Sequence, residues 1–71
     1  MNKTKITIRG NYDEIIYTLD EHVGKLLHSR PLIFWHGDGW HMKSVRNNEG
    51  WPAYEIEFDN EYDSTMFMLR L

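Results

Sequence analysis

Alternating polar and apolar positions at the start of the chain predict a first β-strand. Between Lys3 and Arg9 the side chains of Thr4, Ile6 and Ile8 fall on one side of an extended backbone. Successive side chains of a strand point to opposite faces, so this period of two is typical of a half-buried strand. Gly10 ends the pattern.

A helical pattern follows the first strand. Asn11 and Glu14 have the spacing of a capping box, which marks a helix start. The apolar positions that repeat at about 3.6 residues form one stripe: Ile15, Ile16, Leu19, Val23, Leu26 and Leu27. The residue before a proline disfavours helical dihedral angles. We therefore expect this helix to end near His28 or Ser29, before Pro31.

A β-hairpin is predicted between Pro31 and Arg46, because Gly37-Asp38-Gly39 is rich in residues that tolerate positive φ. A turn at Asp38-Gly39 pairs His36 with His41, whereas a turn at Gly37-Asp38 pairs Trp35 with Trp40. Both registers give the same two faces. One face carries Ile33, Trp35, Trp40 and Met42, and the other carries Leu32, Phe34, His36, His41, Lys43 and Val45.

A third alternating run, residues 53–58, closes an antiparallel meander after a turn at residues 47–50. Apolar and charge patterns agree on one register with the preceding strand. Its pairs are Trp40 with Phe58, Met42 with Ile56, Lys43 with Glu55 and His41 with Glu57. The helix is then expected to cover a core of Ile6, Ile8, Trp35, Trp40, Met42, Tyr54, Ile56 and Phe58.

The tail, residues 59–71, supports two interpretations. Asp59 or Asn60 could cap a short helix with Tyr62, Met66 and Leu69 on one face. Thr65, Phe67, Leu69 and Leu71 also alternate as in a strand. We favour the helix. The predicted fold is one α+β domain over residues 1–71: a β-α-β-β-β order with a short C-terminal helix, its antiparallel meander packed on one helix.

Composition narrows the classes of function. A chain of 71 residues supports one core, and the absence of cysteine removes disulfides and thiol chemistry and fits a reducing cytoplasm. A net charge of −3 argues against nucleic acid as the partner of this small acidic protein. No apolar stretch approaches the ~20 residues of a membrane span, and the alternating N-terminus is not a signal peptide. We expect a cytoplasmic protein that does not engage a membrane.

Two histidines and one aspartate near the hairpin turn form a candidate metal-binding site. His36, Asp38 and His41 offer imidazole and carboxylate ligands of the kind that transition metals bind, which defines a small metal-binding protein or enzyme as one alternative. Tight turns usually direct their aspartate outward, so we prefer an ordinary hairpin tip. No nucleophile motif or phosphate loop is present in the sequence, and we expect neither catalysis nor a cofactor.

The sheet face away from the predicted helix is the candidate partner-binding surface. It combines apolar side chains with a charged rim: Leu32, Phe34, His36, His41, Lys43, Val45, Glu55 and Glu57. One possibility is that the C-terminal segment folds over this face, because monomers rarely leave large apolar patches bare. The other is that a second protein covers it, either a homodimer mate or a different chain.

The closing segment carries the one family resemblance. Residues 58–71, Phe-Asp-Asn-Glu-Tyr-Asp-Ser-Thr-Met-Phe-Met-Leu-Arg-Leu, resemble the end of many small tailed-phage proteins, in which a strand and an acidic cap precede a Phe-x-Leu-Arg-hydrophobic ending. The resemblance implies a phage origin and action in the host cytoplasm. Small phage proteins of this kind often bind and inhibit or redirect a host factor. A component of the phage particle is the alternative that the same resemblance allows.

Overall fold

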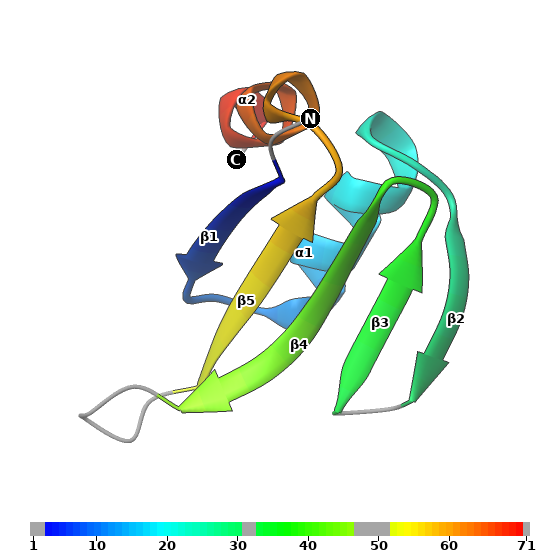
Figure 1. Ribbon diagram of the computed structural model, residues 1–71. Coiled ribbons are helices and arrows are strands. Elements are labelled where there is room, and N and C mark those ends of the chain that lie inside the picture. The colour runs from blue at the N-terminus through cyan, green and yellow to red at the C-terminus, as the bar shows by residue number, and fades with distance from the viewer. Residues whose placement is uncertain (1–2, 31–32, 47–51, 71) are drawn as a thin grey trace.

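A five-stranded antiparallel sheet with two helices forms the protein (Figure 1). The computed structural model describes residues 3–30, 33–46 and 52–70. The elements are β1 (Thr4–Ile8), α1 (Tyr12–His22), β2 (Leu26–Arg30), β3 (Phe34–Gly37), β4 (Trp40–Arg46), β5 (Pro52–Phe58) and α2 (Glu61–Arg70). The α+β class and the C-terminal helix are confirmed, and one strand, β2, adds to the predicted order.

The first helix is shorter than predicted, because it ends at His22 and the chain then forms β2. The backbone N–H of Leu26 donates to the Asp20 carboxylate at 2.7 Å, which turns the chain back toward the sheet. Pairing with β3 supplies the backbone hydrogen bonds that a longer helix would have supplied. Leu26 still packs against the core, whereas Leu27 is exposed and His28 lies in a strand.

Strand order in the sheet is β1-β5-β4-β3-β2, with every neighbouring pair antiparallel. His36 pairs with His41, so the Asp38-Gly39 turn is correct, and Gly39 has the positive φ of +84° that this turn requires. All four predicted pairs between β4 and β5 are confirmed. The sequence pattern did not predict that β1 pairs with β5.

The core lies between the sheet and the helices. Six predicted core side chains are buried there: Trp35, Trp40, Met42, Tyr54, Ile56 and Phe58. Ile15 and Leu19 of α1 complete the packing, and Ile6 and Ile8 pack against its edge. Ile33 was expected on this face, but it sits in the turn before β3 and is exposed.

The C-terminal helix α2 packs on the same side of the sheet as α1, across the end formed by β1 and β5 (Figure 1). Asn60 caps it by accepting the Asp63 N–H at 2.8 Å. The predicted buried face is wrong, because Tyr62 and Leu69 are exposed while Ser64 and Phe67 are buried. The alternative in which the C-terminal segment folds over the opposite face of the sheet is wrong, because α2 packs on the same side as α1.

Candidate binding face of the sheet

The sheet face opposite the helices, here called the open face, is organised as two rows of paired residues. Directly paired residues in a sheet place their side chains on the same face. One row crosses all five strands: Lys5, Glu57, His41, His36 and His28. The neighbouring row contains Thr7, Glu55, Lys43, Phe34 and Arg30. Figure 1 views the sheet from this side, with α1 behind it.

The open face brings together seven of the eight residues predicted to bind a partner. His36, His41 and Lys43 are exposed there, whereas Phe34, Val45, Glu55 and Glu57 are half-buried. The eighth, Leu32, lies outside the described residues. Phe34 therefore lies among charged and imidazole groups on a surface that neither helix covers, and Val45 pairs with a third apolar residue of this face, the buried Ala53.

Two glutamates of β5 hold an ion-pair network on one half of the open face. Glu55 accepts Lys5 and Lys43, each at 3.6 Å. Glu57 lies 3.3 Å from His41 Nε2 and 3.8 Å from the ammonium groups of both Lys3 and Lys5. Exposed pairs of this kind add little stability, because water already solvates both charges. The network instead leaves the β1-β5-β4 half close to neutral.

The other half of the open face, on β2 and β3, is aromatic and basic. His28 and Phe34 have ring centroids 5.8 Å apart, and His36 and His41 have centroids 6.3 Å apart in an edge-on arrangement. Neither β2 nor β3 contains an acidic residue, and Arg30 is exposed beside Phe34. Sequence reasoning missed His28 and Arg30 because it assigned residue 28 to the helix end. No alternating pattern marked this strand, because Leu26 and Leu27 are both apolar and residues 28–30 are all polar.

The three candidate metal ligands at the hairpin do not form a coordination set. His36 and His41 face each other across β3 and β4, as the register required. Asp38 lies in the exposed turn, where its backbone N–H donates to the Lys25 carbonyl at 2.9 Å. Among residues 3–30, 33–46 and 52–70, no group of three or more histidine or carboxylate side chains has the arrangement that a metal ion needs.

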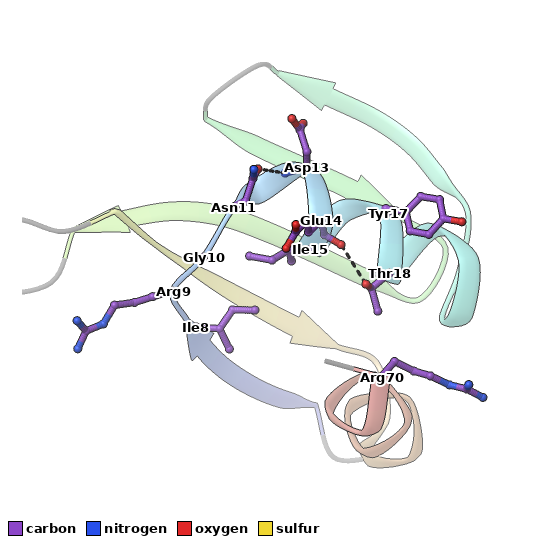
Figure 2. A pocket seen from close by; sticks show the side chains of 10 residues that line it. All are labelled: Ile8, Arg9, Gly10, Asn11, Asp13, Glu14, Ile15, Tyr17, Thr18 and Arg70. Atoms are coloured by element: carbon purple, nitrogen blue, oxygen red, sulfur yellow. Dashed lines mark hydrogen bonds between the residues drawn. The ribbon is translucent and has the colours of Figure 1, made fainter.

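A groove of about 640 Å³ runs on the helix side, between the β1–α1 connection and α2 (Figure 2). Ile8 and Ile15 form its apolar part, and its rim includes Arg9 and Arg70, which point away from each other. Asn11 is occupied in capping α1, where it accepts the Asp13 N–H at 2.9 Å. The charged groups do not converge on a common point, so we assign no ligand to this groove.

Comparison with known proteins does not place the chain in a family. No family model matches the sequence, and no curated protein or solved structure matches it either. Across the part of the chain that the structure describes, neither helix has the length and apolar character needed to cross a membrane.

Proposed function

We propose that the chain is a non-catalytic protein-binding module whose open face docks on another protein. The observation that carries this proposal is the one-sided packing of α1 and α2, which leaves Phe34 and Val45 without a cover from either helix. Protein interfaces commonly have a small apolar centre with a polar rim that stays in contact with water. The open face has this composition around Phe34, which lies beside His28, Arg30 and Lys43.

The partner that fits this surface offers acidic and aromatic groups to the β2-β3 half. Glu55 and Glu57 already have lysine neighbours, so they leave little negative charge to attract a basic surface. Arg30, His28 and His36 have no carboxylate on their own strands. A carboxylate placed near Arg30 would form a charge-assisted hydrogen bond, and an aromatic ring could stack on Phe34.

A phage-encoded modulator or inhibitor of a host factor is the biological role that we propose for this module. The support is the resemblance of residues 58–71 to the ends of small tailed-phage proteins. Such a module acts in the host cytoplasm and needs no cofactor. A component of the phage particle would behave differently, since the purified protein would assemble into rings or lattices.

The test uses capture from host lysate followed by binding measurements with the purified partner. We expect Phe34→Glu to weaken binding at least about tenfold, because it places a charge in the apolar centre of the face. Tyr17→Glu is the matched control, since it adds the same charge on an exposed position of α1. Circular dichroism should be unchanged for both variants. Equal binding by the wild type and Phe34→Glu would refute the open face as the docking site.

A further inference from the structure

The turn between β3 and β4 contains Asp38-Gly39, the one place in the sequence where an aspartate or asparagine precedes a glycine. Asp38 is exposed, and Gly39 has a φ of +84°. Glycine has no side chain, so its backbone nitrogen is the least shielded in a chain. The turn therefore holds a carboxyl group next to an accessible backbone nitrogen on a surface that water reaches.

Neither of these two groups has a partner within the described residues. The Asp38 carboxylate forms no hydrogen bond or ion pair there, and the Gly39 N–H donates to no acceptor. The backbone hydrogen bonds of the turn use other atoms. The Asp38 N–H donates to the Lys25 carbonyl at 2.9 Å, and the Gly39 carbonyl accepts the Asp59 N–H at 3.0 Å. No hydrogen bond therefore keeps the carboxyl group away from the nitrogen.

The remaining four aspartates are less suited to such an encounter: Asp13, Asp20, Asp59 and Asp63. Three of them lie in α1 or α2, where helical dihedral angles fix the backbone. Two of these three also accept a hydrogen bond, Asp20 from the Leu26 N–H at 2.7 Å and Asp63 from the Asn60 side chain at 3.0 Å. Asp59 is exposed, but the residue after it is Asn60, whose side chain crowds the nitrogen. Asp59 is thus the natural control.

We propose that Asp38 is a site of spontaneous isomerisation to isoaspartate. The Gly39 nitrogen attacks Cγ of the Asp38 carboxyl group, a C–N bond forms, and the carboxyl hydroxyl leaves with the amide proton as water. The product is a five-membered succinimide. Water then opens the ring. Addition at the backbone carbonyl carbon leaves the chain linked through Cγ, which is isoaspartate, and addition at Cγ restores aspartate. Water is the only reactant, and the final mass equals the initial mass.

Isomerisation at Asp38 would disturb the turn, because it lengthens the backbone by one carbon between the two anchoring hydrogen bonds. The added carbon lies between the Asp38 N–H and the Gly39 carbonyl, so these two groups cannot both keep their positions against Lys25 and Asp59. The pair of His36 with His41 follows directly after the turn. We therefore expect the isomerised chain to be less stable and to have an altered histidine pair on the open face. A loss of partner binding would follow, a step that rests on the proposed function.

The isomerisation itself is measured without a partner. Purified wild-type protein is kept for several weeks at physiological temperature and neutral pH, then methylated by an isoaspartyl methyltransferase and mapped by mass spectrometry of its peptides. We expect several times more isoaspartate at Asp38 than at the other four aspartates together. No isoaspartate at Asp38, or an equal amount at Asp59, overturns the proposal.

Three variants test the mechanism at the exposed turn. Asp38→Glu keeps the charge but needs a six-membered ring, which closes slowly, so methylation at residue 38 should be lost. Asp59→Glu is the matched control and should keep the wild-type level. Asp38→Asn should react faster, because ammonia leaves more readily than water, and each event raises the mass as an amide becomes an acid. Wild-type methylation of Asp38→Glu, or a rate for Asp38→Asn no higher than that of the wild type, refutes the mechanism. Circular dichroism should be unchanged for all three.

The structural consequence is tested on the isomerised protein, which reversed-phase chromatography separates from the unmodified form. After refolding, we expect a lower urea midpoint and shifted NMR signals for His36 and His41. An identical midpoint and unshifted signals would refute the role assigned to the two anchoring hydrogen bonds. Failure of the proposed function has a different signature, since isomerisation at Asp38 would still be detected in a protein that binds no partner.

Discussion

The indole Nε1 of Trp40 donates a hydrogen bond of 2.6 Å to the backbone carbonyl of Gly24. Trp40 begins β4 in the middle of the sheet, and Gly24 lies where α1 has ended and β2 has not yet begun. The Asp38 N–H, from the hairpin turn, bonds to the adjacent Lys25 carbonyl. The hairpin thus fixes the point at which the chain leaves the helix.

Trp40→Phe is expected to destabilise the protein by about 2–4 kcal/mol. The smaller ring leaves a cavity in the core, and the Gly24 carbonyl loses its donor. Urea unfolding followed by circular dichroism measures the change. Trp35→Phe is the control, because it also shrinks a buried indole but keeps this hydrogen bond. Its loss of stability should be smaller by about 1 kcal/mol or more, and equal losses would contradict the assigned role.

The substitution Gly24→Ala tests where α1 ends, because its effect on stability has opposite signs inside and outside a helix. Inside a helix this substitution would stabilise the protein by about 1 kcal/mol. In the observed structure the added Cβ would overlap the carbonyl oxygen of Asp38, which is backbone and cannot move aside easily. We therefore expect a loss of about 2–3 kcal/mol in the free energy of unfolding. A gain in stability would show that the helix continues through residue 24.

The face of α2 that holds the helix can be measured with a pair of truncations. Phe67→Ala should destabilise the protein by about 3–4 kcal/mol, because it empties a fully buried site. Leu69→Ala should change the stability by about 0.5 kcal/mol or less, since the side chain is exposed. Urea unfolding followed by circular dichroism measures the loss of stability for both variants. The reverse order of effects would restore the face that the sequence pattern predicted.

The ion pairs of the open face are expected to contribute little to stability. Glu55→Gln removes both lysine contacts, and those lysine side chains are 56% and 58% exposed. We expect a loss of about 1 kcal/mol or less, and a smaller difference at 1 M salt because the charges are screened. Urea unfolding at low and high salt checks this. A salt-independent loss above about 2 kcal/mol would indicate that Glu55 has a structural role instead.

The central meander could be predicted from the sequence because two independent patterns agree there. Apolar pairs such as Met42 with Ile56 and charged pairs such as Lys43 with Glu55 require the same register. A shift of one residue would place both sets on the wrong faces. The open face was therefore largely predictable, as were the positions of Phe34 and His36 on it.

The parts that could not be predicted depend on contacts between distant residues. The apolar period of α1 continues through Val23 and Leu26, so local pattern alone favours a longer helix, and the hairpin contact near Gly24 overrides it. Because of this error, the predicted candidate site did not include His28 and Arg30, which lie on β2. In α2, Tyr62 and Leu69 have the same spacing as a buried stripe. Only the position of Phe58 beneath the helix determines that Phe67 is the buried residue.

The pairing of β1 with β5 has a consequence for synthesis. Thr4 lies opposite Phe58, 54 positions later, so β1 has no place in the sheet until β5 has left the ribosome. Closing so long a loop is slow compared with forming the hairpins between β2 and β5. We therefore expect β2 to β5 to form their hairpins first, with β1 joining the edge of β5 afterwards.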